Sequence, residues 1–213
     1  MNLLERIKPV LAAESNDAQL DRYLSEVRES LSASNRQFLA YQALIVGSLV
    51  AYYLVVYGRS TDISLYGFPI HDTKLFQRVF LIVPAALLAA MACVGYLRSL
   101  QREVFDYLTI SRYRVLATTG LHELRLPSDF VLGLFVLKEL GGLPEKITSY
   151  VVASLCAVTF IFAPITYVTT EAIKNIQLFG AGDLLCLAAS LGAISLADCA
   201  LLVVLFGSLV QAT

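Results

Sequence analysis

One carboxyl group stands alone in the last apolar run of the sequence, which extends from Leu184 to Val210. Asp198 lies near the middle of this run, and the run is longer than the about 20 apolar residues that suffice to cross a bilayer. A carboxyl group at that depth costs about 2.5–3.5 kcal/mol when it faces lipid. We therefore expect that protein groups or a water-filled cavity receive Asp198.

Two kinds of chemistry suit this residue. In the first, a protonated carboxyl forms a hydrogen bond across a helix interface, and Thr159 and Ser48 are predicted at the same depth in two other spans. In the second, Asp198 lines a water-filled path for protons or ions, because ionisable residues inside a membrane commonly mark such paths. The sequence leaves both interpretations open.

Signatures of enzymes and metal sites are absent from the sequence. It contains no Walker loop, GxGxxG, GxSxG or HExxH motif, and its cysteines have no CxxC spacing. His71 and Asp72 adjoin, but the other histidine, His122, is predicted on the opposite side of the membrane. We therefore expect no enzymatic activity, no metal ion and no cofactor.

The composition indicates which elements position Asp198. Hydrophobic residues make up 57% of the 213 residues and charged residues only 15%, whereas a soluble domain carries about 25% charged residues. The predicted spans are residues 37–57, 79–97, 147–170 and 184–210. The predicted connecting segments are residues 1–36, 58–78, 98–146 and 171–183. The sequence thus predicts an all-α integral membrane protein with four transmembrane helices and no cleavable signal peptide.

The first two spans are predicted to extend into water as a helical stalk. Ser15 to Asp17 favours a helix start, and no Pro or Gly follows before the first span. One continuous helix is therefore expected from Asp17 to Tyr57. A heptad stripe, typical of helices packed along one another, precedes the first span: Leu20, Leu24, Val27 and Leu31. We expect this stripe to be buried against the extension of the second span.

Prolines and a capping residue predict local features. Pro164 is expected to kink the third span near Phe160, and Pro84 to bend the second span. Asp183 is expected to cap the last span, and residues 58–75 to form a turn or a small hairpin. The apolar stretch 130–137 is too short to span, and it is expected to dock on the bundle, lie at the interface or re-enter the membrane.

Two strips of small residues are predicted to pack helices together. Ala43, Gly47 and Ala51 follow one another at four-residue spacing in the first span, and Ala85 and Ala89 do so in the second. Such spacing lets helix backbones approach closely in lipid. We expect homo-oligomerisation, chiefly through the strip of Ala43, Gly47 and Ala51.

Positive charge predicts the orientation of the chain. Twelve Lys and Arg residues fall before the first span or between the second and third spans, and four fall on the other side. The side richer in Lys and Arg is generally cytoplasmic. The sequence therefore predicts a multi-pass protein of the cell (inner) membrane with both termini in the cytoplasm.

Two functions fit these expectations better than an enzyme does. The first is a homo-oligomeric pore, channel-like or membrane-perturbing effector in contact with the lipid bilayer. The second is a membrane anchor or sensor whose stalk recruits a soluble cytoplasmic protein, and no nucleic-acid partner is expected. The predicted architecture is similar to that of small four-span bacterial membrane effectors of antiviral systems, although a shared architecture does not define a function.

Overall fold

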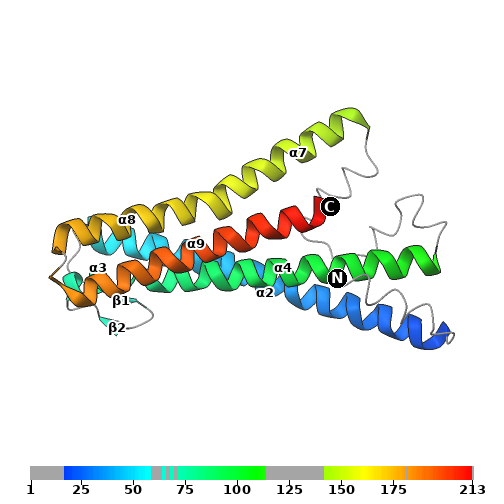
Figure 1. The fold of residues 1–213 in the computed structure, drawn as a ribbon, viewed down its shortest axis with the longest axis horizontal. Helices are drawn as coiled ribbons and strands as arrows, with labels where there is room; N and C mark the ends of the chain where they lie inside the picture. Colours follow the sequence, from blue (N-terminus) through cyan, green and yellow to red (C-terminus); the bar gives the residue numbers. More distant parts are fainter. Residues whose placement is uncertain are drawn as a thin grey trace. The chain divides into compact units, whose positions relative to one another are not determined.

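The computed structural model describes residues 17–58, 64–65, 68–69, 72–113, 142–180 and 182–212. These residues are helical apart from one two-stranded hairpin (Figure 1). The helical elements are α2 (Asp17–Tyr57), α3 (Thr73–Val79), α4 (Ile82–Arg112), α7 (Leu143–Ala157), the π-helical turn η2 (Val158–Phe162), α8 (Ala163–Phe179) and α9 (Leu184–Ala212). The predicted all-α class is confirmed.

Four helical stretches of the described chain are long and apolar enough to cross a membrane. They are Ala18–Tyr57, Thr73–Ser111, Tyr150–Phe179 and Leu184–Val204. By length and composition, the chain is thus a multi-pass membrane protein.

The chain divides into two compact units, each with its own core. Unit 1 comprises residues 1–36 and 97–155, and unit 2 comprises residues 37–96 and 156–213. Helix α2 begins at Asp17 and ends at Tyr57, as predicted, and so contributes residues to both units.

The core of unit 1 joins α2 to α4. Its buried residues are Val27, Leu31, Val104, Phe105 and Leu108, with Leu20 and Leu24 packed against them. Two side-chain hydrogen bonds also join the helices. Ser34 Oγ donates to Gln101 Oε1 (2.9 Å), and Gln101 Nε2 donates to Ser30 Oγ (2.8 Å). The predicted contact between the heptad stripe and the extension of the second span is confirmed.

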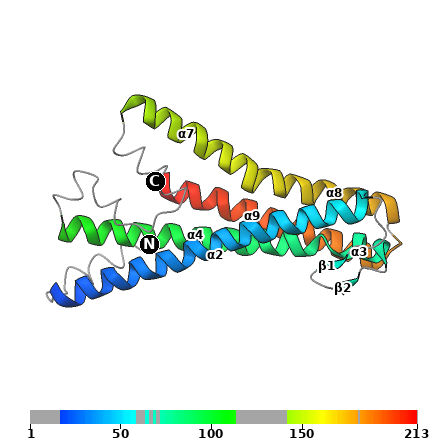
Figure 2. The same ribbon diagram turned by 180° about the vertical axis from the view of Figure 1, so that it is seen from behind.

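The core of unit 2 is built from α2, α4, α8 and α9. Its most buried members include Tyr52, Ala85, Leu88, Val168 and Ala197. Helices α8 and α9 follow one another through a short turn and run side by side in opposite directions (Figure 2). Small side chains on α9 allow this close packing.

The second span begins differently from the prediction of residues 79–97. Helix α3 starts at Thr73, where the Asp72 carboxylate accepts a hydrogen bond from the backbone N–H of Leu75 (2.9 Å). A turn at Phe80 and Leu81 then interrupts the helical stretch Thr73–Ser111, so Pro84 lies in the first turn of α4. Proline is tolerated there because the first N–H groups of a helix have no partner inside it.

The third span is irregular at the predicted place. The π-helical turn η2 immediately precedes α8, and Pro164 is the second residue of α8. Proline lacks an N–H group and cannot continue the hydrogen-bond ladder, which commonly accompanies such turns. The helix also continues to Phe179, beyond the predicted end of the span at residue 170, so Glu171 and Lys174 lie inside α8.

The connection between α2 and α3 contains the predicted small hairpin. Strand β1 (Ser64–Leu65) pairs antiparallel with β2 (Phe68–Pro69). Several predictions lie outside the described residues, namely the apolar stretch 130–137, His71 and His122.

Candidate functional site

The start of α9 is anchored through Asp183, which lies in the turn before the helix. Asp183 Oδ1 accepts a hydrogen bond from the backbone N–H of Cys186 (3.1 Å), so the predicted cap is confirmed. Asp183 also forms an ion pair with Arg78 of α3 (3.0 Å), and the Arg78 guanidinium lies 4.7 Å from the centre of the Phe179 ring. The turn between α8 and α9 is therefore fixed to α3.

Helix α9 has a packed face of small residues and an opposite open face. The buried residues of the packed face are Cys186, Ser190, Ala193, Ala197 and Ala200. The exposed residues of the open face are Leu184, Ala188, Leu191, Ser195, Asp198 and Leu202. Both sets step by four and three positions and are offset by two, which places them on opposite sides of an α-helix.

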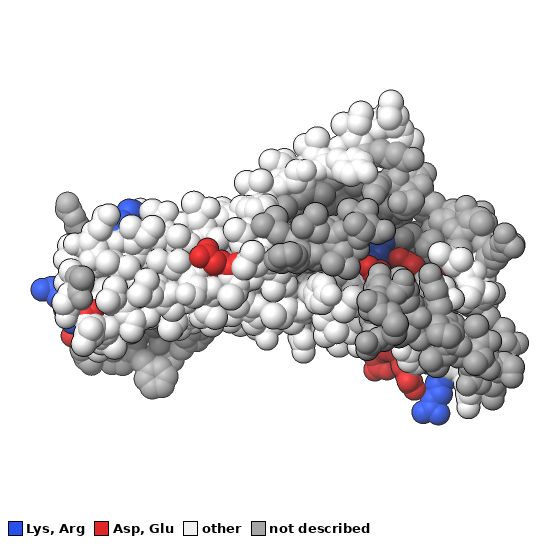
Figure 3. Space-filling model, in the orientation of Figure 1, with Lys and Arg blue, Asp and Glu red and all other residues white. Residues whose placement is uncertain are grey.

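Asp198 thus points away from the core of its own unit. Figure 3 shows acidic atoms over the middle of α9, on a stretch of surface whose described residues are otherwise uncharged. Asp198 is the only ionisable acid or base between Leu184 and Ala212 apart from Cys186 and Cys199. The open face of α9 therefore carries one carboxyl group among apolar and small polar side chains.

The structure does not bring Asp198, Thr159 and Ser48 together. Ser48 is buried, and its hydroxyl donates to the backbone oxygen of Ile45 in its own helix (2.8 Å). Thr159 is exposed on η2, and no hydrogen bond joins it to Asp198 among the described residues. Within the part of the chain that the structure describes, Asp198 has no polar partner.

The two predicted strips of small residues have different surroundings. Ala43 and Gly47 are exposed and Ala51 is half-buried, and a Cβ placed on Gly47 would meet no atom within 4 Å. Ala85, by contrast, is fully buried in the core of unit 2, and Ala89 is half-buried. The strip on α2 is therefore open in a single chain, whereas the strip on α4 already packs helices within the chain.

A buried polar network in unit 2 was missed by the sequence analysis. Asn175 of α8 is 1% exposed. Its Nδ2 donates to the hydroxyl of Tyr52 (3.2 Å) and to the backbone oxygen of Gln77 (2.8 Å), and its Oδ1 accepts from Gln77 Nε2 (3.2 Å). The thiol of Cys186 donates to the Asn175 backbone oxygen (3.6 Å). Four helices, α2, α3, α8 and α9, thus meet at one amide.

One turn before Asn175 on α8, Glu171 extends the polar network. Its carboxylate is nearly fully buried, and it accepts hydrogen bonds from the Tyr57 hydroxyl (2.8 Å) and from Lys174 Nζ (2.6 Å). Burying a carboxylate is costly unless it is paired and hydrogen-bonded, and both partners are present here. A sequence signal existed, because Val168, Glu171 and Asn175 share one helix face.

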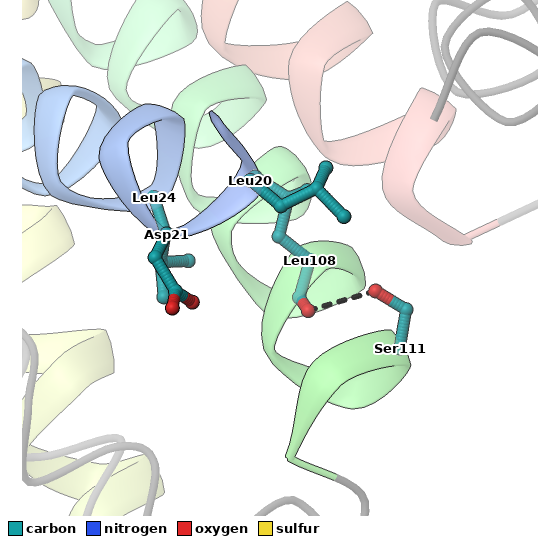
Figure 4. A pocket seen from close by; sticks show the side chains of 5 residues that line it. All are labelled: Leu20, Asp21, Leu24, Leu108 and Ser111. Carbon is teal, nitrogen blue, oxygen red and sulfur yellow. Dashed lines mark hydrogen bonds between the residues drawn. The ribbon is translucent and has the colours of Figure 1, made fainter. Parts of the chain in front are cut away.

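One small pocket lies in unit 1, between α2 and α4. Figure 4 shows its lining, which consists of Leu20, Asp21, Leu24, Leu108 and Ser111. Ser111 donates to the backbone oxygen of Leu108 (2.8 Å), and Asp21 accepts from the Tyr113 hydroxyl (3.2 Å). The space suits about one water molecule, so it does not fit an organic ligand.

Comparisons with known proteins add no function to this geometry. No protein-family model, no curated protein and no solved structure matches the chain. Within the described ranges, no group of three or more His, Cys, Asp or Glu residues could hold a metal ion. The candidate functional features of the described residues are therefore the open face of α9, the open strip on α2 and the buried network.

Proposed function

We propose that this chain is a non-enzymatic protein of the cell (inner) membrane that assembles with copies of itself into a pore, as a channel-like or membrane-perturbing effector. The observation that carries the proposal is the exposure of Asp198 in the middle of a span. Facing lipid would cost this carboxyl about 2.5–3.5 kcal/mol. A neighbouring copy or a column of water removes that cost.

The limited burial of all four spans supports assembly. At most 33% of the residues in the apolar window of any span are buried within one chain. Lipid or further copies must cover the remaining surface. The strip of Ala43, Gly47 and Ala51 suits another helix, because small residues allow the close backbone contact that drives helix association in membranes.

Replacing Gly47 with leucine tests assembly and pore formation together. No atom lies within 4 Å of a Cβ placed on Gly47, so the fold of the single chain should persist. The added bulk should keep a neighbouring helix away from the strip. We expect a smaller assembly by light scattering in mild detergent, and a several-fold loss of ion flux through liposomes that contain the purified protein.

Ala86→Leu provides the matched control, because Ala86 is also small and exposed but lies on α4. This variant should retain the assembly size and flux of the unmodified chain. A monomeric unmodified protein in mild detergent would refute the proposal. Equal losses of assembly size and flux in Gly47→Leu and Ala86→Leu would show that the α2 strip has no specific role in assembly.

The proposed orientation places both termini in the cytoplasm. It is supported by the twelve-to-four division of Lys and Arg residues. In a chain whose native cysteines are replaced by serine, Thr73→Cys should react with an impermeant thiol reagent added to intact cells. Leu121→Cys should react only after the cells are opened, and the reverse pattern would show that the orientation is inverted.

Unit 1 favours a second function, a membrane anchor or sensor that recruits a soluble cytoplasmic protein. Its core between α2 and α4 is formed without any residue of unit 2, so it could present a folded surface in water. Under this alternative, purified protein in liposomes passes no ions. Removal of residues 1–36 would instead abolish capture of the partner.

A further inference from the structure

We infer that the open face of α9 lines the proposed pore and that the pore is selective for cations; this inference rests on the proposed function. The open face is the set Leu184, Ala188, Leu191, Ser195, Asp198 and Leu202 defined above. It places Asp198, the one Asp or Glu between Leu184 and Ala212, on a surface that the rest of unit 2 leaves exposed.

The polar groups of this face are concentrated at its middle. Ser195 and Asp198 are three positions apart, so their side chains are neighbours on the helix surface. Cys199 is exposed beside them. Leu191 and Leu202, each 51% exposed, flank this polar centre on either side.

Symmetry would convert this face into rings. Most homo-oligomers have closed rotational symmetry, and each copy then contributes the same residues at the same height. Copies of α9 around an axis would form a ring of Ser195 hydroxyls next to a ring of Asp198 carboxyls. Leu191 and Leu202 would form apolar rings beyond them, of the kind that can gate a pore by excluding water.

The charge of the face determines which ions it favours. No Lys or Arg occurs between Leu184 and Ala212, so no cation on α9 offsets the carboxyl ring. Rings of Asp or Glu side chains favour cations in channels. Protons and alkali cations share this chemistry and have to be distinguished by experiment.

The open strip on α2 is a poorer lining for such a pathway. Residues 37–57 contain no Asp, Glu, Lys or Arg, and Gly47 offers space but no polar side chain. This strip suits contact with another helix. The two open surfaces therefore have separate roles, with α2 joining the copies and α9 facing the ions.

Reversal potentials across bilayers under a KCl gradient test the inference. The unmodified protein should favour K⁺ over Cl⁻, and a pH gradient in place of the KCl gradient identifies protons. Asp198→Asn should lower the cation preference several-fold, while Asp198→Glu should retain it. Thr170→Val, at an exposed position of α8, should change nothing.

Thiol accessibility provides a second readout that does not depend on the carboxyl. In the chain whose native cysteines are replaced by serine, Ser195→Cys should react with a water-soluble thiol reagent, and the reaction should block flux. Gly47→Cys should be protected within the assembly.

The outcomes separate the inference from the proposed function. Absence of flux in the unmodified protein, with intact oligomers, would overturn both. Flux with equal K⁺ and Cl⁻ permeability, unchanged in Asp198→Asn, would overturn the inference alone, as would a protected Ser195→Cys. If Asp198→Asn fails to assemble, the reaction of Ser195→Cys with the thiol reagent shows whether the open face of α9 lines the pore.

Discussion

Leu31→Asp is expected to separate α2 from α4 in unit 1 and to lower the stability of that unit by more than about 3 kcal/mol. Leu31 is fully buried, in the cluster that contains Val104, Phe105 and Leu108. Burial of a leucine side chain contributes about 1.5–3 kcal/mol. An unpaired carboxylate at the same place adds its own desolvation cost.

Two measurements would report this effect. Hydrogen exchange should become much faster for the amides of residues 20–34 and 101–112, because these helical segments lose their packing partner. The melting temperature of the detergent-solubilised protein should fall. Leu31→Ala should act in the same direction, at a cost of about 2–5 kcal/mol. Its effect should be smaller than that of Leu31→Asp, because alanine leaves a cavity but buries no charge.

Tyr23→Asp is the matched control for this prediction. Tyr23 lies on the same helix and is 42% exposed, so a charge there remains in contact with solvent. Its effect should lie within about 0.5 kcal/mol of zero. Equal exchange rates in Leu31→Asp and Tyr23→Asp would show that the core of unit 1 does not hold the two helices together.

The success of the sequence analysis in unit 1 has a local cause. Helix α2 contains no helix breaker between Asp17 and Phe38, and its stripe repeats every seven residues. Such a pattern specifies both the helix and the face that it buries, because polar residues occupy the opposite face. The stripe and its partner surface on α4 could therefore be predicted from spacing alone.

The same argument fails for α9, because this helix is apolar on nearly every side. Lipid is as apolar as leucine, so large apolar residues do not mark the packed face in a membrane. The structure buries Ala193 and Ala197 and exposes Leu191 and Leu202. The missed signal was the strip of small residues from Cys186 to Ala200, which identifies the packed face and so the direction of Asp198.

The buried network of unit 2 could not be predicted from spacing within any one helix. Tyr52 and Asn175 are 123 positions apart, and Gln77 and Asn175 are 98 apart. Only the packing of helices from distant parts of the chain brings these side chains together. The sequence did contain a local hint, because Glu171 and Asn175 lie on the face of α8 that also carries Val168.

Asn175→Leu is expected to destabilise unit 2 by about 2–4 kcal/mol. The substitution replaces the amide with an apolar side chain of similar size. It leaves the Tyr52 hydroxyl, the Gln77 side chain and the Gln77 backbone oxygen without their present partner. For the three groups together, the average of about 0.6 kcal/mol measured for a bond between membrane helices gives a lower limit of about 2 kcal/mol. The cost of about 1–3 kcal/mol for each unsatisfied buried group raises the expected total above that limit.

A double-mutant cycle with Tyr52→Phe separates the polar contact from packing. Tyr52→Phe removes only a hydroxyl group, so it should destabilise the unmodified protein and have almost no effect once Asn175 is leucine. The coupling energy should exceed about 0.5 kcal/mol, as is usual for residues in direct contact. Ser190→Ala is the control, because Ser190 is equally buried but lies 3.9 Å from its one partner, Cys186 Sγ. Thermal unfolding in detergent measures all five proteins, and additive effects of Tyr52→Phe and Asn175→Leu would contradict the network.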